Sequence, residues 1–321
     1  MDPVAPPSLD DVRAARARLG AQVVRTPLVR LRADDAGAEI FLKLENLQPM
    51  GSFKLRGATH AMSLATDEAL ARGVYTASAG NMAQGVAFCA RARGIPCSVI
   101  VPDTAPEAKL AALDRLGARI HKVPFAEWWN VLVTHRHARF EERLFIHPVS
   151  APAVIAGNGT IGLEIAEDLP DVDAVLVPYG GGGLVTGIAA AVRALRPGAR
   201  VYACESETAA PLSAAIAAGE PRSIAYTPSF VDGIGSTSVL AEMWPAVRRV
   251  IDGSITVSLD AIARAVRLLA ERQRVIAEGA GATPVAAALT GKAGTGKIVC
   301  VVSGGNIDLS KLIKIFHGEV P

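Results

Sequence analysis

Seven short apolar segments that alternate with helical patterns constrain the fold of this chain more than any other feature. They span residues 40–44, 74–77, 97–101, 120–123, 174–178, 201–204 and 298–302. A strand that is apolar along its whole length is buried on both faces, as in parallel sheets covered by helices. The sequence therefore predicts an α/β fold in which mainly parallel, twisted sheets are flanked by helices.

The length of the chain indicates two lobes. With 321 residues, half of them apolar, it exceeds the usual size of a single domain. No internal repeat or low-complexity linker divides it, so we expect the second lobe to be an insertion into the first. We predict a large domain formed by residues 1–53 and 150–321 and a small inserted domain formed by residues 54–149.

The composition favours a small-molecule ligand. The 33 basic and 31 acidic residues nearly cancel, and no block of like charge offers the basic surface that nucleic acid or an anionic membrane requires. Residues 174–192 carry no charge, but Pro178 and the glycines that follow would break a membrane-spanning helix. The four cysteines lack metal-site or redox spacing, and no signal peptide precedes them, so we expect reduced core residues in a cytoplasmic protein.

Four polar or glycine-rich segments together predict a cofactor site. They are Ser52-Phe53-Lys54-Leu55-Arg56-Gly57, Ser78-Ala79-Gly80-Asn81, Gly180-Gly181-Gly182-Gly183 and Ser303-Gly304-Gly305-Asn306. Lys54 follows an extended segment at 39–45 and could serve as an imine-forming amine. The Ser78 segment, taken alone, is also typical of an ordinary turn.

The four-glycine run predicts a phosphate site. It follows the strand at 174–179 and opens a helix at about Leu184. Consecutive N–H groups without Cβ atoms can converge on an anion at a helix N-terminus, where the macrodipole adds to the attraction. The alternative is a tight strand-to-helix turn, which rarely needs more than one or two glycines. Ser303 likewise follows an apolar strand, at the edge where α/β sheets bind ligands.

Two other phosphate-binding patterns are coincidental. Residues 157–162 match G-x-G-x-x-G, but Pro152 makes the preceding segment a poor first strand. Residues 291–297 mimic a phosphate loop, yet Ile298 occupies the position of the magnesium-binding Ser or Thr, and a strand follows. The clearest helix is predicted from Ser258, its N-cap, to the glycines at 279–281.

In this order, the four segments resemble the fold type II family of pyridoxal-phosphate enzymes, whose fold is tryptophan synthase β-like. The resemblance is greatest to the threonine and serine dehydratase (ammonia-lyase) branch, which includes serine racemase, and it spans nearly the whole chain. It rests on Arg25-Thr26-Pro27-Leu28, residues 43–54, residues 78–84, the glycine run, Ala277-Glu278-Gly279-Ala280-Gly281-Ala282 and the Ser303 turn. It implies two lobes with mainly parallel sheets and a homodimer.

The resemblance also implies a role for each motif. Lys54 would hold pyridoxal 5'-phosphate through an imine, and Phe53 would pack on the pyridine ring. The remaining cofactor-binding residues would be Asn81 at the phenolic oxygen, Gly180, Gly181, Gly182, Gly183 and Leu184 at the phosphate, Glu278, and Ser303 at the pyridine nitrogen. The substrate would be bound by Ser78, Ala79, Gly80, Asn81 and Met82.

These roles imply a β-elimination. A neutral Ser303 hydroxyl makes the ring a weaker electron sink than a carboxylate partner would, which favours departure of a leaving group over a long-lived carbanion. Lys54 would be the general base at Cα. The expected reaction is dehydration of L-threonine or L-serine to a 2-oxo acid and ammonia. The alternatives are a dehydratase for a bulkier β-hydroxy amino acid (hydroxyaspartate, phenylserine or an ectoine-derived compound), an amino-acid racemase and a non-catalytic cofactor carrier.

Three positions depart from the family pattern. Ala79 replaces the serine that acts as second base in racemases, so dehydration is favoured. Met82 replaces a histidine that is usual in dehydratases, which leaves the substrate open. In the cation site of some relatives, Glu205 and the carbonyl of Ala209 are kept, but Pro211 supplies no carboxylate, so we predict no Mg²⁺ or Ca²⁺ site. A monovalent ion or water at Glu205 is the alternative.

Residues 125–148 are the least regular part of the sequence. Trp128 and Trp129 either line the entrance for a bulky substrate or form a hydrophobic cluster between the lobes, which is favoured. His135 and His137 lack a third ligand of suitable spacing, so we expect packing or surface roles rather than metal binding. Because the sequence ends at Pro321, we expect no C-terminal regulatory domain.

Overall fold

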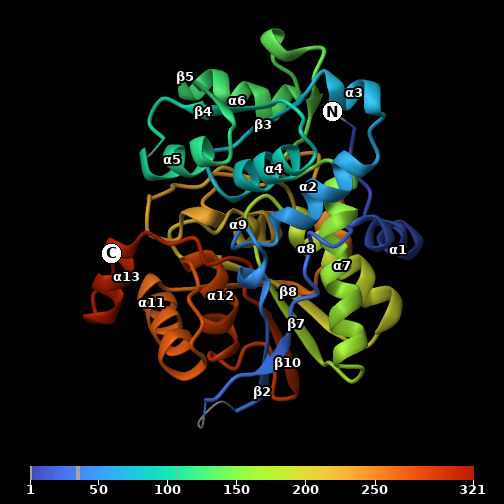
Figure 1. Cartoon of the computed structure of the whole chain (residues 1–321). Helices are drawn as coiled ribbons and strands as arrows, with labels where there is room; N and C mark the ends of the chain where they lie inside the picture. The colour runs from blue at the N-terminus through green and yellow to red at the C-terminus, as the bar shows by residue number, and fades with distance from the viewer. Residues whose placement is uncertain (1, 34–36, 106) are drawn as a thin grey trace.

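Two sheets organise the chain in the computed structural model, which describes residues 2–33, 37–105 and 107–321 (Figure 1). The six-stranded sheet contains, in spatial order, β1 (Leu28–Arg30), β2 (Glu39–Lys43), β10 (Lys297–Val301), β7 (Ala174–Pro178), β8 (Arg200–Ser206) and β9 (Gly253–Val257). The four-stranded sheet contains β5 (Arg119–Val123), β4 (Cys97–Pro102), β3 (Val74–Ala77) and β6 (Leu144–Phe145). Among the strands of the described residues, only β1 and β2 pair antiparallel, so the predicted α/β fold with mainly parallel sheets is confirmed.

Helices cover both faces of the six-stranded sheet because its strands are apolar on both sides. Along β7, Ala174 and Leu176 belong to one core, and Val175 and Val177 belong to the other, as alternation along a strand requires. The first core includes α11 (Leu259–Leu268), α12 (Gly279–Ala288) and α13 (Leu309–Phe316), and the second includes α7 (Pro152–Asp168), α8 (Gly183–Leu195), α9 (Pro211–Ala218) and α10 (Trp244–Val250). Helix α1 (Leu9–Arg18) packs on α7 and α8 through Val12.

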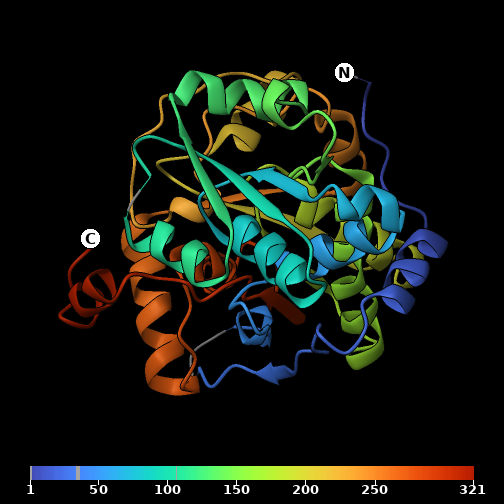
Figure 2. The same ribbon diagram turned by 45° about the horizontal axis from the view of Figure 1, so that its top comes forward.

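The four-stranded sheet is covered in the same way. One core is shared with α2 (Lys54–Ser63), α3 (Asp67–Ala71), α4 (Asn81–Ala92) and α5 (Glu107–Arg115), and the other with α6 (Phe125–Thr134). Figure 2 shows the sheet between α6 on one side and α4 and α5 on the other. Short 3₁₀ helices η1 (Glu45–Leu47), η2 (Ala138–Phe140) and η3 (Asp232–Ile234) lie in the connections between these elements.

Helix α2 joins the two lobes (Figure 1). It packs directly on α7. The two helices are so close that a Cβ atom at Gly157 would lie 2.8 Å from the carbonyl oxygen of Arg56. Residues 157–162, the G-x-G-x-x-G pattern, are therefore the interior of α7 and not a loop after a strand. A Cβ at Gly162 would lie 2.6 Å from the Ile188 carbonyl oxygen. The glycines let α7 approach both α2 and α8 closely.

The helix predicted from Ser258 begins as expected but ends early. Ser258 Oγ accepts the Ala261 N–H at 3.2 Å, whereas the helix passes into a π turn, η4 (Leu269–Gln273), and stops at Arg274, which has a φ of 60°. Gly279 does not end this helix, because it is the first residue of α12. A Cβ there would lie 2.9 Å from Val231, so the glycine serves a close contact.

The region around the two tryptophans is more regular than predicted. Residues 125–134 form α6, and Trp128 packs beside Tyr75 and Phe140 on a face of the four-stranded sheet. The expectation of a cluster between the lobes is wrong, because the apolar side of α6 faces its own sheet. All four cysteines are buried and free, as expected of core residues. Within the described ranges, no helix has the length and apolar character needed to cross a membrane.

Candidate active site

The candidate site lies where carboxyl ends of parallel strands meet the start of α2. Strand β10 leads into Ser303, β7 leads into the glycine run, and β3 leads into Ser78. Ser52 forms an isolated antiparallel bridge with Gly304, and the Phe53 N–H donates to the Ser303 carbonyl at 3.0 Å. This edge is where open α/β sheets bind their ligands. Segments far apart in the sequence thus converge beside Lys54.

Lys54 is the first residue of α2, and its side chain is partly buried. Its Nζ donates to the Pro148 carbonyl oxygen at 2.7 Å and lies 5.1 Å from the centroid of the Phe53 ring. Burial lowers the pKa of Lys54 to about 8, partly opposed by the carboxylate of Glu278. An amine with this pKa is available as a nucleophile or a base near neutral pH.

The glycine run opens α8 with unpaired donors. Gly182 is the N-cap, with a φ of 98°. The N–H groups of residues 180–185 have no hydrogen-bond acceptor among the residues that the structure describes. Cβ atoms at Gly181 and Gly183 would lie 2.6 Å and 2.4 Å from atoms of Val149, so larger residues do not fit. Unpaired N–H groups at a helix N-terminus are a site for an anion.

A hydrogen-bonded chain connects α4 of one lobe to α12 of the other. Asn81 Nδ2 donates to Glu278 Oε1 at 2.9 Å, and Asn306 Nδ2 donates to Asn81 Oδ1 at 2.8 Å. The Glu278 N–H donates to the Gly304 carbonyl at 3.0 Å. Burial, reinforced by the nearby Asp232 carboxylate, raises the pKa of Glu278 to about 7, although the Asn81 donor opposes the shift. Ser303 is buried beside this chain.

The turn formed by residues 78–81 lies at the same site, and its residues are accessible to a ligand. The Gly80 N–H donates to Ser78 Oγ at 3.2 Å, and no atom lies within 4 Å of where a Cβ of Gly80 would stand. Ser78, Ala79, Gly80 and Asn81 are all partly exposed. Met82 differs, because it is 1% exposed and packs in the core of the four-stranded lobe with Leu55. The structure therefore brings the polar turn to the site and places the Met82 side chain in the core.

Comparison with known proteins identifies the family. Residues 20–304 match the family described as pyridoxal-phosphate dependent enzyme. This chain belongs to that family. It is 38% identical over 318 residues to the L-threonine ammonia-lyase of Thermotoga maritima, covering 97% of this chain and 78% of that relative. It is 39% identical over 318 residues to the catabolic L-threonine dehydratase TdcB of Escherichia coli K12, covering 97% and 96% of the two chains.

A solved structure agrees with the family assignment. Maize serine racemase superposes with a TM-score of 0.87 at 33% identity, covering 97% of each chain. The resemblance to fold type II enzymes of the threonine and serine dehydratase branch is thus confirmed. The cofactor of this pyridoxal-phosphate-dependent enzyme is pyridoxal 5'-phosphate.

The residues at the site fit this cofactor. A partly buried lysine amine beside an aromatic ring suits a covalent link to an aldehyde. The unpaired N–H groups of the glycine run suit its phosphate, and the close approach of Val149 explains why the run lacks Cβ atoms.

Both carboxylate oxygens of Glu205 accept hydrogen bonds from described residues, one at Oε1 and three at Oε2. Its oxygens accept the N–H groups of Leu212 and Ser213 in the first turn of α9, each at 2.8 Å, and the hydroxyls of Ser213 and Ser254, each at 2.7 Å. Burial raises the pKa of Glu205, while these four donors oppose the shift. Across the described part of the chain, no group of three His, Cys, Asp or Glu residues could hold a metal ion.

The sequence does not indicate several of the groups that lie around Lys54. The acceptor for its amine is the backbone carbonyl of Pro148, which any residue could supply. Lys109 of α5 pairs with Asp232 of η3 at 2.8 Å and joins the two lobes beside Glu278. Isolated charged residues of this kind are usually surface residues, so only the folded chain shows that they meet.

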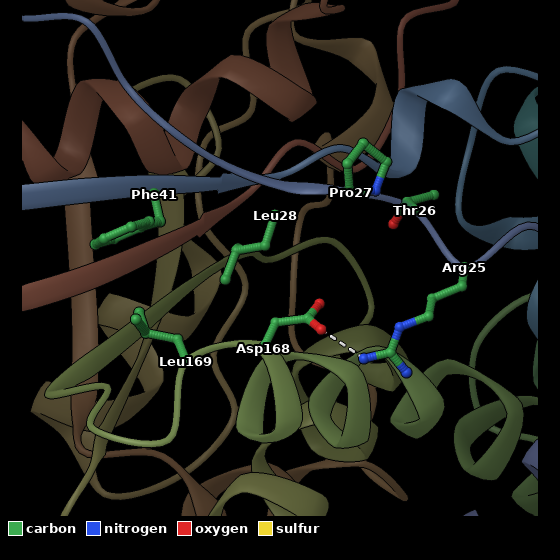
Figure 3. A pocket seen from close by; sticks show the side chains of 7 residues that line it. All are labelled: Arg25, Thr26, Pro27, Leu28, Phe41, Asp168 and Leu169. Carbon is green, nitrogen blue, oxygen red and sulfur yellow. Dashed lines mark hydrogen bonds and ion pairs between the residues drawn. The ribbon is translucent and has the colours of Figure 1, made fainter.

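A surface cavity of about 440 Å³ lies apart from these residues (Figure 3). It is lined by Arg25, Thr26, Pro27, Leu28, Phe41, Asp168 and Leu169. In Figure 3 the side chains of Arg25 and Asp168 point toward each other, and Arg25 Nη2 donates to Asp168 Oδ1 at 2.5 Å. None of the candidate site residues borders this cavity.

Proposed function

We propose that this pyridoxal-phosphate-dependent ammonia-lyase dehydrates L-threonine or L-serine to a 2-oxo acid and ammonia. One observation carries the proposal: the partly buried Lys54 amine lies in one site with the unpaired glycine N–H groups and the open Ser78 turn. The relatives named L-threonine ammonia-lyase and L-threonine dehydratase, at 38% and 39% identity over nearly the whole chain, support the substrate class.

We assign the cofactor contacts as follows. Lys54 makes the covalent link, Phe53 packs on the ring, and Gly180, Gly181, Gly182 and Gly183 bind the phosphate, with Leu184 packed behind them. Ser303 pairs with the pyridine nitrogen, Asn81 with the phenolic oxygen, and Glu278 holds Asn81 in place. When bound, the cofactor supplies an electron sink for the negative charge that develops at Cα.

The chain's own residues would then carry the proton and the substrate. Once the amino group of the substrate has displaced it from the cofactor, the Lys54 amine, whose pKa burial lowers to about 8, would accept the Cα proton and pass a proton to the β-hydroxyl, which leaves as water. The N–H groups and side chains of Ser78, Gly80 and Asn81 orient the substrate carboxylate. Ala79 has no group that could exchange a proton on the opposite face, which supports elimination over racemisation.

The division into domains is also a proposal. All strands of the four-stranded sheet lie between residues 74 and 145, which supports a small domain at 54–149 and a large domain at 1–53 and 150–321. We further propose a cytoplasmic homodimer, on the resemblance to the family. Sedimentation analysis of the purified protein tests the dimer, and a single monomeric species would contradict it.

The function is tested by adding L-threonine, L-serine and phenylserine separately to the purified holoenzyme. We expect equal amounts of ammonia and 2-oxo acid from threonine or serine. Borohydride reduction followed by peptide mass spectrometry should find the cofactor on Lys54. The Lys54→Ala variant is the control, and it should keep its circular dichroism spectrum but lose both the adduct and the turnover.

Three outcomes would contradict the proposal. Net formation of D-serine would indicate a racemase, and turnover of phenylserine alone would indicate a bulky substrate. A bound cofactor with no product from any substrate would indicate a carrier.

A further inference from the structure

His147 closes the turn that follows the four-stranded lobe. Its side chain is buried, and Nδ1 accepts the N–H groups of Val149 at 3.1 Å and Ser150 at 2.7 Å, with Ser150 Oγ at 3.0 Å. Because two backbone N–H groups point at Nδ1, this nitrogen carries no proton. The proton therefore sits on Nε2, which donates to the Leu132 carbonyl at 3.2 Å. The contacts select one neutral tautomer.

The surroundings keep this imidazole neutral. The His135 ring lies against it, with centroids 4.3 Å apart, and His135 Nε2 is 3.3 Å from Ser150 Oγ. Burial lowers the pKa of His147 to about 3, with the charges of His135 and Lys54 adding to the effect and the Leu132 carbonyl opposing it. Burial also lowers the pKa of His135, and the carboxylate of Glu242 partly opposes that shift. His147 is therefore a fixed hydrogen-bond acceptor rather than a proton carrier.

The turn from His147 to Ser150 contacts both halves of the cofactor site. The Pro148 carbonyl accepts the Lys54 amine at 2.7 Å. The next residue, Val149, fills the space beside Gly181 and Gly183. A shift of this turn would move the partner of the amine and the wall of the glycine run together.

We propose that His147 is a positioning residue, whose Nδ1 sets the turn that holds the Lys54 amine and the glycine run in place for the cofactor. The inference rests on the proposed role of Lys54. The physical reason is that no other acceptor serves the N–H groups of Val149 and Ser150 in the described part of the structure. Without Nδ1 these buried donors would be unpaired, and the turn would rearrange to satisfy them.

Two substitutions test the contributions of the two nitrogens of His147 separately. In His147→Asn, the amide oxygen stands near the position of Nδ1 and can accept the same N–H groups, as in an Asx turn. In His147→Gln, the amide reaches the position of Nε2 and leaves no acceptor at the position of Nδ1. The Gln variant therefore keeps the Leu132 contact and loses the turn contact, whereas the Asn variant does the reverse.

We expect the Gln variant to bind pyridoxal 5'-phosphate more weakly, with a dissociation constant raised about tenfold or more, because it leaves buried donors unpaired. It should also shift the pH midpoint at which the lysine-linked cofactor titrates in its absorbance spectrum. The Asn variant should keep both values near those of the wild type. His60→Gln is the matched control, since His60 is also buried and its Nδ1 contacts the Ala153 carbonyl at 2.8 Å, in the first turn of α7 and outside the 147–150 turn. It should lower the melting temperature without changing either cofactor value.

Equal losses in the Asn and Gln variants would overturn the positioning role. So would a Gln variant that, like the His60 control, changes only the melting temperature. A wild-type protein whose cofactor is not linked to Lys54 would instead refute the proposed function, and this is seen before any variant is made.

Discussion

Glu278 is a residue whose ionisation the fold alters strongly. A Cβ at Gly304 would lie 2.7 Å from its Oε1, and one at Gly233 would lie 3.3 Å away, so the backbone closes around the carboxyl group. Its pKa rises from 4.5 to about 7, through burial first and the Asp232 carboxylate second. The carboxyl group is thus half protonated near neutral pH beside Lys54.

This shift predicts a pH dependence of stability. Because the raised pKa makes the folded state bind the proton more tightly than the unfolded state, the protein should lose stability as pH rises from 4.5 to about 7. Glu278→Gln keeps an acceptor for Asn81 but cannot ionise, so its free energy of unfolding should not fall over this pH range. The difference in unfolding free energy between the variant and the wild type should therefore be about 3 kcal/mol more favourable to the variant above pH 7 than at acidic pH. Denaturation of the cofactor-free proteins across this range measures it, and parallel curves would disprove it.

At the scale of elements, the N-terminus of α8 depends on its contact with the turn before α7. Alanine at Gly183 would place a Cβ 2.4 Å from the Val149 carbonyl oxygen, which belongs to the backbone and cannot rotate away. Gly198, which follows α8, has nothing within 4 Å of a Cβ. The two glycines therefore form a matched pair.

Gly183→Ala should destabilise the protein by about 1–3 kcal/mol, as overpacking does, although alanine favours a helix. It should also weaken cofactor binding, because α8 must move away from Val149. Gly198→Ala should change stability by less than about 0.5 kcal/mol. Urea denaturation and cofactor titration measure both effects, and identical behaviour of the two variants would show that the contact is unimportant.

Helix α9 is capped by Glu205, which predicts independence from divalent cations. Three donors fill Oε2 and one binds Oε1, and Pro211 supplies no second carboxylate, so too few oxygens are left to hold a hard cation. Chelation with EDTA, or addition of Mg²⁺, should leave the melting temperature and ammonia release unchanged. A loss on chelation that Mg²⁺ restores would refute the assignment.

At the scale of the whole molecule, a buried ionic cluster ties the helix that carries Lys54 to the six-stranded lobe. Arg56 of α2 pairs with Glu45 at 2.8 Å and with Glu164 of α7 at 2.6 Å. Lys43 of β2 pairs with the same Glu164 at 2.6 Å, and all four side chains are almost fully buried. Breaking a buried pair leaves an uncompensated charge, which costs far more than losing a surface pair.

Arg56→Met should therefore destabilise the protein by about 3–5 kcal/mol. Arg72→Met is the control, because the Arg72 pair with Glu68 is exposed, with side chains 44% and 85% accessible, and should contribute less than about 1 kcal/mol. Thermal and urea denaturation distinguish them. A small effect at Arg56 would mean that water or a rearranged side chain compensates the carboxylates.

Local patterns predicted the strands well where both faces are apolar. Residues 74–77 and 174–178 form β3 and β7 with the same bounds. The sequence missed β9, in which buried and partly exposed residues alternate, and the short edge strands β1 and β6. Such strands depend on pairing with a neighbour, so their own residues carry little signal.

Polarity, glycine spacing and the order of motifs are local properties, and from them the sequence alone determined the fold class, the family and the set of segments at the site. Tertiary structure decided which side chains meet at the site, and it set their pKa values and hydrogen-bond partners. The pKa values of Lys54 and Glu278 depend on burial and on charges distant along the chain. The acceptor of the Lys54 amine is a backbone carbonyl 94 residues away. These quantities arise from the distances between atoms and their exclusion from water, which only the folded chain specifies.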